Sequence, residues 1–329
     1  MTGLITVESK VITNPLIDCE SLFAKWIKFA QVKPSSVVGY TKGVKNFLSF
    51  ARANGIAEIT REVLLSYKEY LRPLRPEEKP DPIVGNAGYT AATANLYLTA
   101  TKLFVSFLYQ EKIIAVNAAE HIKTFGGTSE GHAKDALDAD TVKKIAASFD
   151  TSTLKGKRDA ALFATMTCCG TRCIEVSRAN VGDMVKRRGK QFLYVLGKGR
   201  DTKSECVELP PGVYKLIQNY LAARGNVADD APLFASTSHR NSNDRITTNS
   251  ISRLVKRILR ANGIDSKRVT AHSLRHTCAQ EILDQTGKDL RRVQAVLRHR
   301  SVRVTERYLA DEDRFNNNGE RLAAKAFGY

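Results

Sequence analysis

The sequence has no long apolar run. Its 329 residues are 43% hydrophobic and 26% charged, as in ordinary globular proteins. No stretch approaches the roughly 18 consecutive apolar residues that a membrane-spanning helix needs. The first residues also lack the pattern of a charged segment followed by an apolar one that marks a secretory signal. These absences argue against an integral membrane protein and predict a cytoplasmic location.

A disulfide framework and a cysteine metal cluster are missing as well. The six cysteines have no framework spacing in a chain of this length; they are Cys19, Cys168, Cys169, Cys173, Cys206 and Cys278. Three of them lie close together, but no histidine pair or second Cys-x-x-Cys accompanies them. Free cysteines are usually buried and unreactive. We therefore predict buried, inert thiols and no metal ion.

Acidic residues are scarce relative to basic ones. The chain has 51 Lys and Arg against 34 Asp and Glu, a net charge of +17. Residues 1–124 hold 15 basic and 11 acidic residues, and residues 125–329 hold 36 and 23. Such an excess favours a polyanionic partner, because basic side chains attract phosphates and release their counterions. A solubilising basic surface is the alternative. A membrane-surface partner has less support, since no basic amphipathic helix stands out.

Internal repeats and low-complexity tracts are absent, and helical periodicity dominates the first third of the chain. After an irregular lead-in (1–18), a helical domain is predicted over 19–123. The expected helices cover residues 22–30, 35–51, 60–71 and 90–111, followed by a short one that ends near Lys123. On the fourth, Leu96, Ala100, Leu103, Phe104 and Phe107 line one face. Residues 73–88 contain four prolines and are expected to form a loop.

Residues 124–136 are rich in Gly and mixed charges and predict a linker. The second domain, 137–313, is predicted to be mostly helical with a small antiparallel sheet, so the fold is mainly α with an α+β second domain. Strands are expected at 191–196 and 205–209. The expected helices lie at 138–149, 157–168, 212–224, 248–261, 271–285 and 289–298. A short apolar-faced segment follows in the tail, 314–329.

Several basic residues stand at helix ends and turns of the second domain. Arg172 follows a helix break, Lys198 lies between two glycines in the loop that joins the strands, and His272 and Arg275 are three apart behind the expected N-cap Thr270. A second basic cluster, 298–300, precedes Tyr308 by eight residues. Arginine donates two hydrogen bonds to phosphate and stays charged. Taken singly, each residue is better explained without a catalytic role: Arg172 as a surface charge, Lys198 as a solvated turn residue and His272 as a helix-capping or core residue.

Taken in order, these residues resemble the tyrosine recombinase (phage integrase) family. The matching motifs are CGTRCIEV around Arg172, LGKGRD around Lys198, AHSLRHT around His272 and Arg275, and VLRHRSVRVTERYL, which holds His299 and Tyr308. The resemblance covers nearly the whole chain, since 19–123 looks like the helical core-binding domain of simple Xer-like members. With only about 18 residues ahead of it, no arm-binding domain is expected, which favours a simple Xer- or Cre-like system with few accessory proteins.

The resemblance implies a role for each matching residue. Tyr308 would be the nucleophile that forms a 3′-phosphotyrosine, Arg172 and Arg275 would hold the non-bridging oxygens, and Lys198 would be the general acid. His272 would assist as a base and His299 would stabilise the transition state. The covalent link conserves bond energy and the cations stand in for a metal, so no cofactor is implied.

Two positions depart from the family pattern, and one acidic residue fits it. The usual Leu-Gly-His is Leu297-Arg298-His299 here, and the usual Gly-Leu-Arg is Gly170-Thr171-Arg172. Neither change removes a functional group, although Arg298 adds charge. Glu175, at the family's acidic position, would orient Arg172.

The implied partners are double-stranded DNA with a specific core site and further copies of the chain in a tetramer that forms a Holliday junction, nucleoid-associated when bound. The tail would dock on a neighbouring protomer or pack on its own domain. The expected DNA-contacting residues are Lys42, Lys45, Thr90, Thr93, Asn95, Arg200, Lys203, Asn249 and Arg253. A type IB topoisomerase-like enzyme and a non-catalytic DNA-binding protein on the same fold are the alternatives.

Overall fold

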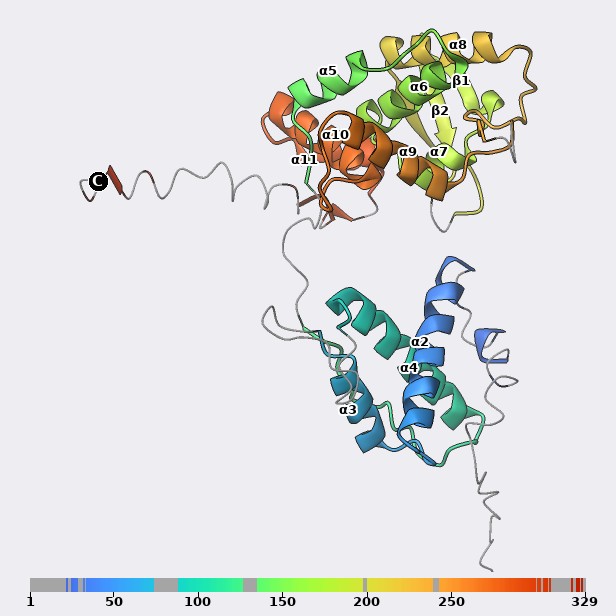
Figure 1. Cartoon of the computed structure of the whole chain (residues 1–329), viewed down its shortest axis with the longest axis vertical. Coiled ribbons are helices and arrows are strands. Elements are labelled where there is room, and N and C mark those ends of the chain that lie inside the picture. Colours follow the sequence, from blue (N-terminus) through green and yellow to red (C-terminus); the bar gives the residue numbers. More distant parts are fainter. Residues whose placement is uncertain are drawn as a thin grey trace, which may run out of the picture. The chain divides into compact units, whose positions relative to one another are not determined.

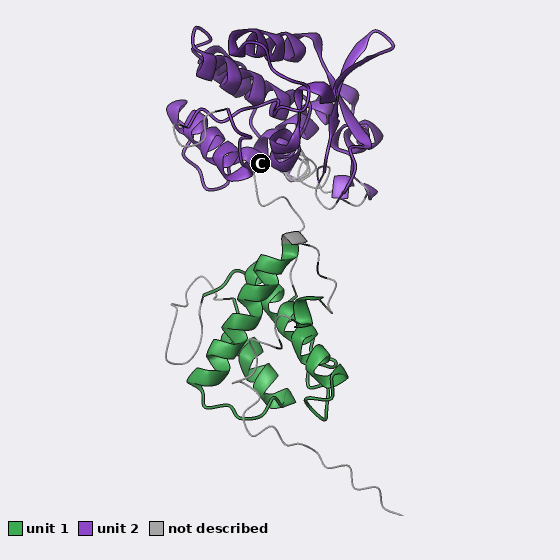
Figure 2. Ribbon diagram, turned by 90° about the vertical axis from the view of Figure 1, so that its right-hand side faces the viewer, with its two compact units in different colours: residues 1–128 green, residues 129–329 purple. Residues whose placement is uncertain are grey.

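The computed structural model forms two compact units, residues 1–128 and 129–329 (Figure 2). It describes residues 22, 25–28, 32, 34–73, 88–126, 135–197, 200–238, 243–299, 301, 302, 304–306, 308, 321, 324, 325 and 327. The division between the units falls inside the Gly-rich segment 124–136. None of the helices in the described residues is long and apolar enough to cross a bilayer.

The named helices in the described part of unit 1 are α2 (Pro34–Ala53), α3 (Arg61–Tyr70) and α4 (Ala91–Gln110) (Figure 1). α2 packs against α4, and an aromatic core lies between the helices, with Trp26, Phe47, Tyr67 and Phe104 buried. Thr60 and Thr90 are the N-caps of α3 and α4, each accepting a hydrogen bond from a backbone N–H three residues on. The helices predicted at 35–51, 60–71 and 90–111 are confirmed here.

Two predictions for unit 1 are wrong. On α4, Leu96 and Leu103 are exposed, while Leu98 and Leu108 are buried. The helix is apolar on more than one side, so periodicity alone did not select the buried face. The short helix expected to end near Lys123 is a series of turns.

The turns of this segment have a local cause. Lys112 and His121 adopt positive φ, which interrupts a helix. The side chain of Asn117 accepts a hydrogen bond from the backbone N–H of Ala119, a local bond that competes with helical ones.

Unit 2 combines seven helices of the described residues with one small sheet (Figure 1). The helices are α5 (Ala139–Ala147), α6 (Leu154–Cys168), α7 (Cys173–Arg178), α8 (Pro211–Arg224), α9 (Thr248–Ala261), α10 (Ala271–Thr286) and α11 (Leu290–Leu297). α6 packs against α8, and α10 contacts α6, α9 and α11. The sequence predicted all of these except α7, which is only six residues long, and it placed the start of α6 three residues too late.

The sheet has three antiparallel strands in the order β1 (Met184–Arg187), β2 (Lys190–Val195) and β3 (Glu205–Leu209). Alternate residues of β2 and β3 enter the core, and Leu193 pairs with Val207 in the register between them. The sequence predicted β2 and β3. β1 was missed because this short edge strand has no buried residue and hence no alternating pattern.

Two of the five described cysteines correct the prediction of buried thiols. Cys169 and Cys278 are buried, but Cys168 and Cys206 are exposed. Cys206 lies on β3, where every second side chain faces solvent. Cys168 is the last residue of α6. No group of three or more ligand-type side chains suited to a metal ion occurs among the described residues.

Candidate active site

Arg275 lies in the second turn of α10, whose N-terminus is held by a capping pair. Thr270 is the N-cap, as predicted, and its backbone N–H donates to Ser273 Oγ at 3.0 Å. Ser273 Oγ in turn donates to the carbonyl of Arg268 at 3.3 Å. These bonds fix the start of the helix and therefore the direction in which Arg275 leaves it.

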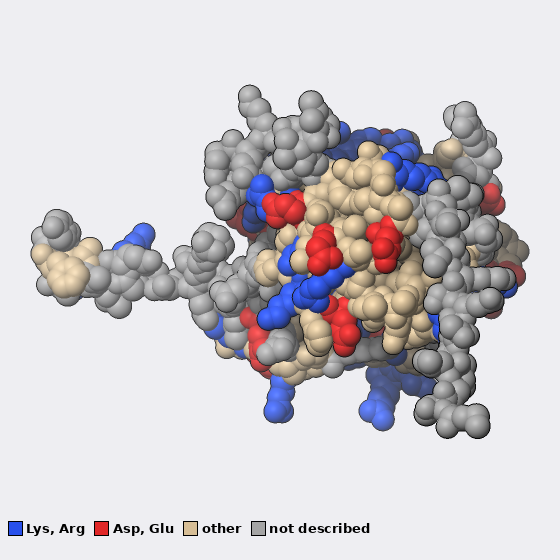
Figure 3. All heavy atoms as spheres, turned by 90° about the horizontal axis from the view of Figure 1, so that it is seen from below, with Lys and Arg blue, Asp and Glu red and all other residues tan. Residues whose placement is uncertain are grey.

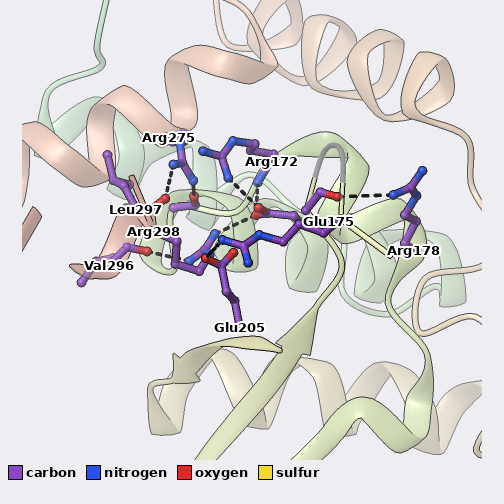
Figure 4. A network of polar contacts seen from close by, with 11 residues as sticks. Arg172, Glu175, Arg178, Glu205, Arg275, Val296, Leu297 and Arg298 are labelled. Atoms are coloured by element: carbon purple, nitrogen blue, oxygen red, sulfur yellow. Dashed lines mark hydrogen bonds and ion pairs between the residues drawn. The ribbon is translucent and has the colours of Figure 1, made fainter. Parts of the chain in front are cut away.

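The guanidinium of Arg275 joins two turns that are far apart in the sequence. It is 1% exposed and donates through Nη1 to the carbonyl of Gly170 and through Nη2 to the carbonyl of Leu297 (Figure 4). Burial lowers the pKa of Arg275 to about 9, and the positive charges of Arg172 and Arg298 act in the same direction. A buried cation with cationic neighbours is stabilised by an anion, which is what a phosphate would supply.

Arg172 is the N-cap of α7 and is paired with Glu175, one turn into that helix. Arg172 Nη1 lies 2.7 Å from Glu175 Oε1, and the backbone N–H of Arg172 donates to Oε2 at 2.8 Å. Glu175 is completely buried, whereas the Arg172 side chain is 31% exposed. The carboxylate therefore holds one edge of the guanidinium while another part of it reaches the surface. This geometry agrees with the predicted orienting role of Glu175.

Arg298 approaches the same carboxylate from the other side (Figure 4). Its Nη2 lies 2.7 Å from Glu175 Oε2, and its Nη1 donates to the carbonyl of Val296 at 2.6 Å. Burial by itself raises the pKa of Glu175, but the charge of Arg298 and the hydrogen bond from the Arg172 backbone outweigh it, so the pKa lies below its ordinary value. Sequence reasoning noted the charge of Arg298 but not this contact, which depends on a residue 123 positions away.

Tyr308 packs beside two histidines of the candidate site. Its ring centroid lies 6.3 Å from that of His299, with the planes nearly parallel, and 5.3 Å from that of His276. His276 also contacts His272, with ring centroids 4.6 Å apart. His299 Nδ1 is hydrogen-bonded to Thr305 Oγ1 at 3.0 Å. Sequence reasoning missed His276 and Thr305, although His276 directly follows Arg275.

Exposure differs sharply among the predicted site residues. His272 is exposed on α10, while Tyr308 is 4% exposed and packs against Leu283, Val293 and Leu297. Arg275 thus joins the turn before Arg172 to the turn before His299, and Tyr308 stacks beside His299. His272 is connected to Tyr308 through His276. Lys198 lies outside the described residues.

The predicted DNA-contacting residues of unit 1 form two groups. Lys42 and Lys45 are exposed on α2. Thr90 and Thr93 are hydrogen-bonded to each other at the start of α4. The side-chain amide of Asn95 donates to the carbonyl of Phe125 and accepts from its backbone N–H. The amide of Asn95 therefore holds the chain after α4 in place.

In unit 2, Asn249 and Arg253 are exposed on α9, whereas Arg200 and Lys203 are paired with Glu205 and Asp183. Arg200 and Lys203 line an open hollow of about 520 Å³, together with Arg178, Asn180, Leu196, Asp201 and Arg245. Two further arginines of this hollow, Arg178 and Arg245, were not predicted, since neither belongs to a recognisable motif. In Figure 3, where unit 1 faces the viewer, basic and acidic side chains are interspersed on the visible face rather than gathered into one patch.

Comparison with known proteins identifies the family. The Phage integrase family is matched over residues 135–314, more than half of the chain. The tyrosine recombinase XerC of Pelobacter propionicus is 27% identical over 281 residues, covering 84% of this chain and 85% of the relative.

Solved structures share the fold. The XerH site-specific recombinase bound to a palindromic difH substrate, in a post-cleavage complex, has a TM-score of 0.69 at 18% identity, covering 95% of this chain and 85% of that one. A lambda integrase tetramer bound to a Holliday junction has a TM-score of 0.59 at 16% identity, covering 86% and 77%. The chain belongs to the phage integrase family and is a site-specific tyrosine recombinase that cleaves and rejoins DNA.

Proposed function

We propose that Tyr308 is the nucleophile and that Arg172 and Arg275 hold the non-bridging oxygens of the scissile phosphate. The strongest support is that the Arg275 guanidinium donates hydrogen bonds to the backbone carbonyls of both Gly170 and Leu297, and so connects two turns. The first turn carries Arg172, and the second leads to His299 and Tyr308. One buried guanidinium thus sets the positions of three other groups of the proposed site.

The proposed reaction follows from these groups. The Tyr308 oxygen gives up its proton and forms a bond to the phosphorus, which stays attached to the 3′ oxygen, while the bond from phosphorus to the 5′ oxygen breaks and that oxygen leaves as a hydroxyl. The arginines stabilise the negative charge of the transition state, His299 assists them, Lys198 protonates the leaving oxygen and His272 acts as a base. Because Tyr308 and Arg275 are almost inaccessible here, DNA binding must expose them.

We further propose that residues 19–123 form a core-binding domain and 137–313 the catalytic domain, joined by the linker 124–136. The exposed residues Lys42, Lys45, Asn249 and Arg253 would contact DNA phosphates. Arg200 and Lys203 would do so by exchanging their carboxylate partners for phosphates. Thr90, Thr93 and Asn95 would contact the DNA at the start of α4.

The proposed assembly is a tetramer on two DNA sites that passes through a Holliday junction, as in the lambda integrase tetramer of the same fold. The tail, 314–329, would link neighbouring protomers. A cytoplasmic, nucleoid-associated location agrees with this role. These proposals rest on family membership and on the basic composition of the chain.

Recovering the target site tests the proposal. DNA covalently trapped on the protein in cells would be sequenced, and two duplexes that carry the recovered site would then be incubated with purified protein. We expect strand-exchanged products. Relaxation of supercoiled plasmid without any exchanged strands would instead favour a topoisomerase-like reaction and would overturn the proposal.

A matched pair of substitutions tests the nucleophile. Tyr308→Phe is expected to abolish exchange while it leaves DNA binding intact. Tyr214→Phe, which removes a hydroxyl bonded to Gln218 on α8, should exchange strands like the wild type. Equal activity of the two variants would rule out Tyr308 as the nucleophile.

A further inference from the structure

Arg298 stands at a backbone position that suits glycine. It is the C-cap of α11 with φ 55° and ψ 44°, the left-handed conformation. Residues with a Cβ adopt it at a cost, and glycine is the usual residue there. In this chain Gly287 ends α10 with φ 61° in the same conformation. An arginine at such a position therefore calls for a compensating contact by its side chain.

That contact is a buried ion pair. The Arg298 side chain is 5% exposed, Glu175 is completely buried, and Nη2 and Oε2 are 2.7 Å apart. The second nitrogen, Nη1, donates to the carbonyl of Val296 and so closes the turn on itself. Arg298 thus ties the turn that leads to His299 to α7, the helix that Arg172 begins (Figure 4).

Two arginines share the Glu175 carboxylate. Oε1 accepts a hydrogen bond from Arg172 Nη1. Oε2 accepts two, one from the backbone N–H of Arg172 and one from Arg298 Nη2. The carboxylate also lies beside the chain that leads to Lys198, since a Cβ added at Gly197 would be 3.7 Å from Oε1. Glu175 therefore touches three segments that carry proposed catalytic groups.

The charges around Glu175 do not balance. Arg172, Arg275 and Arg298 face it from α7, α10 and the end of α11, and across Gly197 lie Arg200 and Glu205, which pair with each other. Without Arg298, the carboxylate would pair with Arg172 alone, and Arg172, Arg275 and Glu175 together would carry a net charge of +1. With Arg298 present, the carboxylate is divided between two guanidinium groups, and the cluster carries a net charge of +2.

We propose that Arg298 is a positioning residue for DNA cleavage: it draws part of the Glu175 carboxylate away from Arg172, so that the carboxylate offsets less of the Arg172 charge that meets the scissile phosphate. This inference rests on the proposed roles of Arg172 and Tyr308. Arg298 itself contacts neither DNA nor Tyr308 in this scheme and acts through Glu175. The low pKa of Glu175, to which Arg298 contributes, supports the same arrangement.

Cleavage rates of three variants test the proposal. Arg298→Met removes the charge at similar volume, and Arg298→Lys keeps the charge but lacks the planar guanidinium group. Arg291→Met, the control, removes an exposed charge from α11. With a nicked duplex that carries the recovered site, we expect single-turnover adduct formation to fall roughly tenfold or more in Arg298→Met, less in Arg298→Lys and not at all in Arg291→Met. DNA affinity should stay within about twofold of wild type, because Arg298 is buried.

The pH profile separates this role from simple packing. Without Arg298 the pKa of Glu175 rises, because the charge that most lowers it is gone. Protonation of Glu175 weakens the two hydrogen bonds by which its carboxylate orients Arg172, so cleavage by Arg298→Met should decline at a higher pH on the acidic side than cleavage by wild type. In Arg298→Met combined with Glu175→Gln, which cannot titrate at this position, that shift should disappear. A defect that is equal at every pH and unchanged by Glu175→Gln would overturn the proposal.

The outcomes distinguish this inference from the proposed function. If wild type forms the Tyr308 adduct and Arg298→Met forms it at the same rate, only the role of Arg298 fails. If wild type forms no adduct, the proposed function fails and the positioning role with it. Acid unfolding provides a readout without DNA: Arg298→Met should unfold at higher pH than Arg291→Met, and Glu175→Gln should remove the difference. An unchanged midpoint would show that Arg298 does not govern Glu175.

Discussion

Two turns of unit 2 that follow helices contain a residue with positive φ, one a glycine and the other an arginine. Gly170, with φ 57°, follows Cys169, the C-cap of α6, and Arg298, with φ 55°, is itself the C-cap of α11. The carbonyls of Gly170 and Leu297 both accept hydrogen bonds from Arg275. Both turns thus have a positive φ and meet at one cation, but the residues that adopt it differ.

Each turn has its own reason for the residue it carries. A Cβ at Gly170 would lie 2.6 Å from Leu297 Cδ2 and 3.3 Å from Cys278 Sγ, so the first turn has no room for a side chain. Arg298 faces Glu175 and gains a buried ion pair. The residue in the first turn is therefore restricted by the lack of room for a side chain, and the residue in the second is favoured by an ion pair.

The largest effect should come from removing the group that joins the turns. Arg275→Lys keeps a positive charge, but a single ammonium group cannot span both carbonyls in the geometry of a guanidinium fork. We expect adduct formation to fall by about 10²-fold or more, by analogy with the loss of one transition-state donor. Quantification of the covalent DNA adduct measures this. Activity within about twofold of wild type would show that the bridge is not needed.

Filling the first turn should destabilise the protein. In Gly170→Ala, the strained φ and the clash with Leu297 should together lower the free energy of unfolding by about 3 kcal/mol. Gly287→Ala is the matched control, because it has φ 61° and open space around it. That variant should lose only about 1 kcal/mol from backbone strain. Urea unfolding of both variants tests the claim. If both lose the same free energy of unfolding, the steric clash at Gly170 is not the cause.

Making the second turn resemble the first gives a smaller effect. Arg298→Gly relieves roughly 1 kcal/mol of backbone strain but leaves a buried carboxylate with one partner fewer, at a cost of about 3 kcal/mol. The net expectation is a loss of about 2 kcal/mol in the free energy of unfolding. A variant more stable than wild type would mean that the Glu175 pair contributes little to the turn.

The pH dependence of stability sharpens the role of charge. Because the folded-state pKa of Glu175 lies below the ordinary 4.5, its contribution to stability is fully present above pH 4.5 and is lost as pH falls through the folded pKa. The difference in unfolding free energy between wild type and Glu175→Gln should therefore shrink on acidification below pH 4.5. Urea unfolding at several pH values measures it. A constant difference would mean that Glu175 does not titrate in this range.

The sequence predicted those parts of the molecule that local patterns specify. Apolar periodicity located α3, α4 and α10, Thr270 was correctly predicted as the N-cap of α10, and alternation located β2 and β3. The short α7 and the exposed strand β1 were missed, because neither is long enough or buried enough to show a period. Asn117 and two positive-φ residues turned an expected helix into turns.

The candidate site was predictable by resemblance but not by local pattern. Arg172, Arg275 and Tyr308 were identified from the order of their motifs, whereas their junction at the carbonyls of Gly170 and Leu297 depends on tertiary packing. The contact between Arg298 and Glu175 joins residues far apart in sequence, and at Arg298 the family pattern predicts glycine. No local rule relates such residues, so only the folded chain shows that they act together.

The most direct test of the account is the identity of the amino acid that becomes linked to DNA. Wild-type protein would be trapped on a nicked duplex that carries its recovered site, digested with protease and analysed by tandem mass spectrometry. We expect a 3′-phosphonucleotide on the peptide that contains Tyr308. A nucleotide on any other tyrosine, or one attached through its 5′ phosphate, would contradict it.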